Sequence, residues 1–127
     1  MTFKAWYMTN TQNLLKQLIK TSHDYSKEDW DSYGAFPVSK KSIANSADFI
    51  MSMPDNIPAP EISVEPDGLV CFDWAKSKSS RFSISIGEKN SIYYAWINCG
   101  NRGYNTVCWD KENIPQEIIS NLNSFLK

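Results

Sequence analysis

Few residues in this chain of 127 amino acids could carry out chemistry, and they are widely spaced. His23 is the only histidine, and together with Asp24 it could activate a nucleophile such as the Cys99 thiol. No local signature brings these three residues together, and a histidine just past a helix end usually caps the helix or faces solvent. Asp29 and Asp31 could hold a cation, but the alternating oxygen ligands and closing glutamate of a calcium loop are missing. The sequence therefore predicts no catalytic residues.

Metal ions, cofactors and nucleic acid are each disfavoured by residue counts and spacing. The three cysteines form no CxxC pair, and metal ligation needs two or more His or Cys side chains close together. The glycines fit neither GxGxxG nor GxxxxGK, so no phosphate-binding loop is predicted. Tyr93, Tyr94 and Trp96 could stack on single-stranded bases, yet the chain has only two arginines and a net charge of −1. We therefore predict no cofactor and no metal, and we rank nucleic acid well behind protein as a partner.

The stretch Asp29–Pro37 (DWDSYGAFP) combines large aromatic side chains with glycine and proline. Trp30 and Tyr33 flank Asp31, and Gly34 permits a positive φ. Because loops are normally polar, these rings either pack into the core or contact a partner. An aromatic ring gains most from burial, so we favour a structural role for Trp30 and Tyr33, with Asp31 hydrogen-bonded to its own loop.

Length and composition predict one domain, residues 1–127, because 42% hydrophobic residues can build a core without metal or disulfide bonds. An odd number of cysteines favours reduced thiols. We expect Cys71 and Cys108 to be buried in strands as small hydrophobic residues, and Cys99 to be exposed in a turn. The apolar run Ala5–Met8 is too short for the core of a signal peptide, and no stretch approaches a transmembrane span. These features predict a cytoplasmic protein.

Helical periodicity occurs three times along the chain. The first helix is predicted at about residues 9–22, with Thr9 or Asn10 as its cap. Ser39 is predicted to cap a second helix, which ends at a proline. Pro115 lies in the first turn of a third helix. The apolar faces of these helices consist of Leu14, Leu15, Leu18 and Ile19; of Ile43, Ala47, Ile50 and Met51; and of Ile118, Ile119, Leu122, Phe125 and Leu126.

Between residues 60 and 110 the hydrophobic period changes to two, which indicates strands. The third predicted strand is apolar on one face only, whereas the second and fourth are apolar on both, so the helices could cover one face of the sheet or both. We predict an α+β fold with two N-terminal helices, a four- to five-stranded antiparallel meander and a C-terminal helix packed on the sheet. The predicted strands are residues 61–65, 69–74, 81–86, 91–98 and 104–109, with a hairpin turn at 66–68 and a loop at 100–103.

Five features occur in a fixed order: the loop Trp30–Ala35 (WDSYGA), a serine-capped helix, Pro60-Glu61-Ile62, Pro66-Asp67-Gly68 and a strand ending at Trp74. Together they resemble a group of small bacterial and phage proteins in which a WDGYGA-type loop precedes a helix, a proline and a meander. The likeness covers residues 26–97. Ser32 stands where glycine is usual, which disfavours a positive φ there. The resemblance implies a prokaryotic or mobile-element origin and carries no catalytic residue.

The shortage of site chemistry and the surplus of aromatic residues favour a binding function. Our hypothesis is a non-catalytic protein-binding module, a phage or mobile-element accessory protein of inhibitor, antitoxin or immunity type that occludes a larger bacterial protein. Two alternatives stay open: a small cytoplasmic enzyme that uses carboxylates or Cys99, and a homodimeric structural protein. The last strand would offer unpaired backbone groups to a foreign protein or to a second copy. The predicted partner-binding residues are Asp29, Trp30, Asp31, Tyr33, Tyr93, Tyr104 and Trp109.

Overall fold

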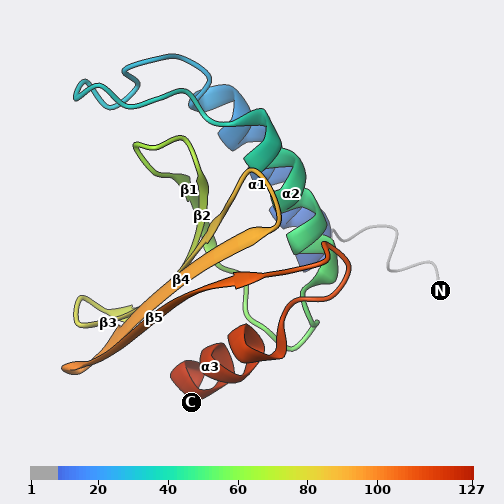
Figure 1. Cartoon of the computed structure of the whole chain (residues 1–127), viewed down its shortest axis with the longest axis vertical. Helices are drawn as coiled ribbons and strands as arrows, with labels where there is room; N and C mark the ends of the chain where they lie inside the picture. Colours follow the sequence, from blue (N-terminus) through green and yellow to red (C-terminus); the bar gives the residue numbers. More distant parts are fainter. Residues whose placement is uncertain (1–8) are drawn as a thin grey trace.

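The computed structural model describes residues 9–127, which form three helices and a five-stranded antiparallel sheet (Figure 1). The run Ala5–Met8 lies outside the described residues. The predicted α+β fold and the predicted order of helices and strands are confirmed. The elements are α1 (Asn10–Asp24), α2 (Lys40–Ser52), β1 (Glu61–Val64), β2 (Val70–Ser77), β3 (Ser80–Ile86), β4 (Ser91–Asn98), β5 (Asn101–Cys108) and α3 (Gln116–Leu126).

The sheet is a simple meander with the strand order β1-β2-β3-β4-β5. The turn between β4 and β5 consists of Cys99 and Gly100, whose φ angles of 51° and 93° are typical of a two-residue hairpin turn of type I′. Such a turn returns the chain at once, so Asn101 already pairs with Asn98. The predicted loop at 100–103 is therefore wrong, and Gly103 lies inside β5.

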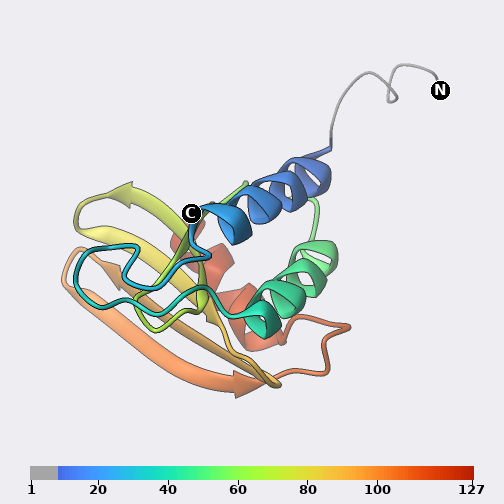
Figure 2. The ribbon, with the colours of Figure 1, turned by 90° about the horizontal axis from the view of Figure 1, so that it is seen from above.

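All three helices pack against the same face of the sheet, and the view from above shows α1 and α2 on one side of it (Figure 2). Between ring centroids, Phe49 of α2 lies 5.0 Å from Phe72 of β2, and Phe125 of α3 lies 5.8 Å from Phe82 of β3. Phe72 and Phe82 share this face, because Phe82 pairs with Trp74, two residues beyond Phe72. The helices thus cover one face and not both.

The first two helices begin where their sequence caps predict. Thr9 and Gln12 form a capping box, in which each side chain accepts a hydrogen bond from the backbone of the other. The Ser39 hydroxyl accepts a hydrogen bond from the backbone N–H of Ser42 at 3.2 Å. These bonds satisfy N–H groups that the first helical turn leaves unpaired, and they confirm both predicted caps.

The buried face of α2 includes Ile50 and the half-buried Ile43 and Ala47, as predicted, but not Met51. Met51 is 60% exposed, whereas polar residues including Ser42 and Asn45 are buried. The Asn45 carboxamide donates to the carbonyl oxygens of Gly87 and Lys89, each at 2.9 Å, in the turn between β3 and β4. The polar groups on the buried face of α2 thus pair with backbone carbonyl groups at the end of β3 and in the turn that follows it, as buried polar groups require.

Candidate functional site

The face of the sheet opposite the helices, here named the open face, is covered by no helix within residues 9–127. Its side chains come from alternate positions of each strand. Tyr93, Ile97 and Tyr104 point to this face and are 41%, 38% and 83% exposed, whereas the neighbouring Ile92 and Tyr94 are buried under the helices. The cross-strand register places the side chains in three rows: Cys71, Ser85, Tyr93 and Thr106; Asp73, Ser83, Ala95 and Tyr104; and Ala75, Arg81, Ile97 and Arg102.

The part of the open face on β1 to β3 is polar, and its groups are bonded to one another. Asp73 accepts a hydrogen bond from the Ser83 hydroxyl at 2.6 Å, and Glu65 accepts one from Ser85. Cys71 lies between these pairs, where burial and then the charges of Glu65 and Asp73 raise the pKa of its thiol to about 12. These mutual bonds leave few polar groups free for a ligand.

The part of the open face on β4 and β5 is mostly apolar, with Thr106 and Arg102 as its polar side chains, and is called here the aromatic half. It carries the three exposed large hydrophobic side chains of the described sheet, Tyr93, Ile97 and Tyr104. Tyr104 extends from β5 beside the small Ala95, and its side chain is 83% exposed. Contiguous exposed apolar groups of this kind mark interaction surfaces more often than isolated ones do.

β5 is an edge strand, and its outward backbone groups belong to even-numbered residues. The Trp109 N–H donates to the Asn90 carbonyl at 2.9 Å, so the odd-numbered positions face β4. The N–H and C=O groups of Arg102, Tyr104 and Thr106 therefore point away from the sheet. β5 spans eight residues without proline and has one charged side chain, whereas β1, at the other edge, has four residues, follows a proline and packs against α1. β5 is thus the edge that is open to another chain.

In the aromatic loop, Trp30 and Asp31 hold the backbone together and Tyr33 faces solvent. The Trp30 indole N–H donates to the Phe36 carbonyl at 2.7 Å, and its ring meets Tyr25 edge to face at 4.7 Å. An Asp31 carboxylate oxygen accepts from the Tyr33 backbone N–H at 2.8 Å. The structural role predicted for Trp30 and the loop bonding predicted for Asp31 are confirmed. The burial predicted for Tyr33 is wrong, since its ring is 91% exposed.

Two residues of this loop other than glycine have positive φ angles, Asp29 at 58° and Ser32 at 64°. The expectation that Ser32 avoids this conformation is therefore wrong. The Ser32 N–H donates to the Asp29 carbonyl at 3.0 Å, and the Asp29 carboxylate accepts from the Gly34 N–H at 2.6 Å. These bonds offset the backbone strain. The carboxylates of Asp29 and Asp31 are thus used within the loop.

Trp109 does not belong to the open face, and its prediction as a partner-binding residue there is wrong. It is 5% exposed, and its ring lies 6.1 Å from that of Phe49 on α2. Tyr104 and Trp109 are five positions apart, so strand alternation turns their side chains to opposite sides. The same alternation exposes Cys108, which was expected to be buried. The alternation of side chains along the strand was the signal that could have placed Cys108 and Trp109 on their correct faces.

The residues considered for catalysis lie in separate parts of the molecule. His23 is in the last turn of α1, and Cys99 is in the exposed turn after β4, with its sulfur 3.6 Å from the Ser80 hydroxyl. No hydrogen bond within residues 9–127 joins His23 to Cys99. In the same part of the chain, no group of three His, Cys, Asp or Glu side chains could hold a metal ion, and no helix is long and apolar enough to cross a membrane.

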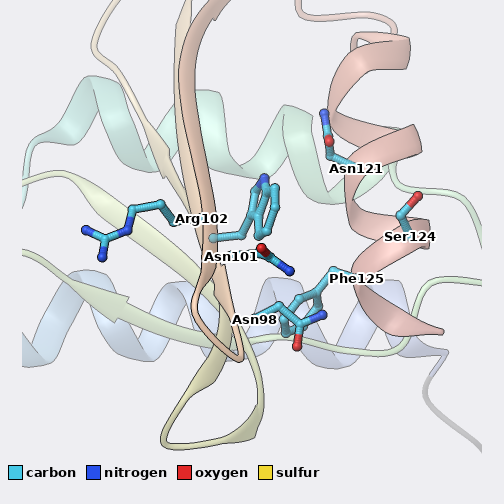
Figure 3. A pocket seen from close by; sticks show the side chains of 7 residues that line it. Asn98, Asn101, Arg102, Asn121, Ser124 and Phe125 are labelled. Carbon is cyan, nitrogen blue, oxygen red and sulfur yellow. The ribbon is translucent and has the colours of Figure 1, made fainter.

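A cleft of about 380 Å³ between the β4–β5 hairpin and α3 was missed by sequence reasoning (Figure 3). Its lining comes from two segments, residues 96–102 and 121–125, that are 19 positions apart, so no local pattern reveals it. A glycine inside a strand often marks a close approach by another group, and Gly103 opposite Trp96 was the one available signal. The lining residues are Trp96, Asn98, Asn101, Asn121, Ser124 and Phe125, together with Arg102.

No model of a known protein family matches this chain, and no curated protein or solved structure matches it.

Proposed function

We propose that this protein is a non-catalytic protein-binding module that engages its partner through the aromatic half of the open face and the adjoining edge of β5. One observation carries the proposal: Tyr104, 83% exposed, lies on the same strand whose outward backbone groups are unpaired within the described chain. Tyrosine is among the residues that contribute most to protein interfaces, and an edge strand supplies hydrogen bonds along its whole length.

The mode of binding that fits this geometry is strand addition. A partner strand placed beside β5 would bond to the outward groups of Arg102, Tyr104 and Thr106. Its side chains on the open face would then lie next to Tyr104, with Tyr93 one strand farther away across β5. Backbone bonding would provide affinity, and the two tyrosines would select the partner's side chains.

The biological setting is proposed from the sequence. The WDSYGA loop resembles that of small bacterial and phage proteins, which supports a prokaryotic or mobile-element origin. The exposed aromatic half and the open β5 edge support an accessory protein of inhibitor, antitoxin or immunity type acting on a larger bacterial protein. Three free cysteines support a reducing compartment such as the cytoplasm. An enzymatic function has no comparable support, because the carboxylates of Asp29 and Asp31 are bonded within their loop.

The test is capture of partners from a bacterial lysate with the wild-type protein and three variants, followed by affinity measurement with the purified partner. Thr106→Pro removes an outward N–H and leaves the bonds to β4 in place, since proline is tolerated at such edge positions. Thr106→Ala is its matched control, because it changes the side chain alone. Tyr104→Ala removes the exposed ring. Unchanged thermal unfolding establishes that each variant is folded.

We expect a partner that the wild type and Thr106→Ala retain and that Thr106→Pro and Tyr104→Ala lose. Retention by all four proteins would contradict the proposed surface. Sedimentation at low micromolar concentration addresses the homodimer: a stable dimer that Thr106→Pro converts to monomer would show that a second copy occupies β5. That result would replace the foreign partner in the proposal.

A further inference from the structure

The cleft between the β4–β5 hairpin and α3 has an aromatic wall that a glycine makes possible. Trp96 pairs across the strands with Gly103, and a Cβ atom on Gly103 would lie 2.7 Å from the indole nitrogen. The indole therefore rests directly on the glycine backbone, and the half-buried ring lines the cleft. Phe125 of α3, which is 4% exposed, adds a second ring to the lining.

Carboxamide groups from both sides of the cleft are held in fixed orientations. The Asn98 side-chain oxygen accepts a hydrogen bond from the Ser80 hydroxyl at 2.9 Å, which directs its NH₂ group elsewhere. The Asn121 NH₂ group donates to the Tyr94 hydroxyl at 3.2 Å and to the Glu117 carbonyl at 2.8 Å. This leaves the Asn121 side-chain oxygen as an acceptor. The hairpin thus offers the Asn98 NH₂ group as a donor, and the helix offers the Asn121 oxygen as an acceptor.

The cleft contains no charged group directed at its interior. Its one charged lining residue is Arg102, whose guanidinium extends to the other side of the strand, away from Asn121 and Ser124 (Figure 3). The nearby Glu117 carboxylate accepts hydrogen bonds from Tyr94 and Asn105. An anionic ligand would find no cation there, and a cationic ligand would find no free carboxylate.

We propose that this cleft binds a neutral ring that carries several hydroxyl groups, that is, a sugar. Carboxamides and the Ser124 hydroxyl can both donate and accept, as can each sugar hydroxyl. An apolar face of a sugar ring matches the accessible surface of the half-buried Trp96 indole. The volume of about 380 Å³ is within the range of small-molecule sites. The inference is independent of β5 strand addition, because the cleft lies on the helix side of the sheet.

The test is a titration of the ¹⁵N-labelled protein, followed by NMR, with glucose, galactose, N-acetylglucosamine and their β-linked disaccharides. We expect at least one saccharide to cause saturable shifts at the Trp96 indole N–H and at the carboxamides of Asn98, Asn101 and Asn121. Adenine is the comparison probe, since it is a flat ring without hydroxyl groups. Shifts that adenine causes more strongly than any saccharide would overturn the assignment to sugars.

Two variants test the residues. Asn101→Ala and Ser124→Ala each remove one polar group, and we expect each to weaken binding at least about fivefold, the effect of one neutral hydrogen bond. Asn123→Ala is the matched control on α3, because it does not line the cleft, and its affinity should equal that of the wild type. The absence of cleft shifts with every saccharide, or equal affinity in all variants, would overturn the proposal.

Discussion

The side-chain oxygen of Ser42 lies 2.9 Å from the backbone nitrogen of Val70 and accepts its hydrogen bond. The same hydroxyl donates to the carbonyl oxygen of Ile86 at 2.6 Å. Val70 and Ile86 are paired across β2 and β3. The Ser42 hydroxyl of α2 therefore provides a hydrogen-bond partner for one backbone group of each strand at this end of the sheet. All three residues are fully buried, and water therefore cannot replace these bonds.

Replacing Ser42 with alanine should be strongly destabilising. We expect Ser42→Ala to lower the free energy of unfolding by about 2–4 kcal/mol, because it leaves two buried backbone groups unpaired. Ser46→Ala is the matched control, since the buried Ser46 hydroxyl has no hydrogen-bond partner among residues 9–127. Its removal should cost less than about 1 kcal/mol or stabilise the protein. Urea unfolding measures both variants, and equal losses would contradict the role given to Ser42.

Glu117 makes the free energy of unfolding depend on pH in the acidic range. Its carboxylate accepts hydrogen bonds from the Tyr94 hydroxyl at 2.5 Å and the Asn105 carboxamide at 2.6 Å, and these bonds hold the pKa of Glu117 below its usual value. A carboxylate with a lowered pKa stabilises the fold above its unfolded-state pKa, and this contribution is lost as the pH falls through the folded-state pKa.

We therefore expect Glu117→Gln to lower the Tm at neutral pH, and the difference from wild type to close as the pH falls below about 4. Glu28→Gln, which removes an exposed carboxylate, is the control and should leave the Tm unchanged at neutral pH. Thermal unfolding followed by circular dichroism across this pH range provides the measurement. A Tm difference of constant size at all pH values would show that Glu117 acts through packing and not through its charge.

The three thiols should differ in reactivity. Burial, aided by the carboxylates of Glu65 and Asp73, raises the pKa of Cys71 to about 12, whereas Cys99 and Cys108 are exposed. Because the thiolate is the reactive form, we expect a disulfide reagent at neutral pH to modify two thiols of the folded protein promptly and Cys71 only after unfolding. Counting released thiolate by absorbance tests this. Rapid reaction of all three in the folded state, or an unchanged fast phase in Cys99→Ser, would contradict it.

The sheet could be predicted from the sequence because strand alternation directly reflects burial on one side. The predicted start of β5 at residue 104 is three residues too late. The positive φ angles of Cys99 and Gly100 form a two-residue turn, so β5 already begins at Asn101. Alternation also separates Tyr104 from Trp109, because side chains five positions apart on a strand point to opposite faces. Each of these errors concerns local geometry that the sequence does encode.

The remaining features depend on which segments meet. Apolar residues mark the buried face of a helix only where it packs on an apolar surface. Ser42 and Asn45 are buried because α2 crosses the strand ends, where backbone groups need partners. The cleft likewise requires α3 to lie opposite the β4–β5 hairpin. The contact of α2 with the strand ends and the contact of α3 with the hairpin leave no periodic signal in the sequence, so neither could be predicted from it.

Trp30 and Tyr33 lie three positions apart in one loop and should respond differently to substitution. Trp30→Ala removes the bond to the Phe36 carbonyl and the packing on Tyr25, so we expect a loss of about 2–3 kcal/mol in the free energy of unfolding. Tyr33→Ala removes an exposed ring and should change stability by less than about 0.5 kcal/mol. Similar losses in the two variants would show that the Tyr33 ring is packed.

Tyr33→Ala then tests whether the loop belongs to the partner-binding surface. The Asp31 carboxylate holds the Tyr33 backbone in place, so the exposed ring is presented from a fixed loop and not from a flexible segment. If the loop contacts the partner, we expect weaker partner capture by Tyr33→Ala with an unchanged urea unfolding curve. Capture equal to that of the wild type would remove the loop from the partner-binding surface and restrict that surface to β4 and β5.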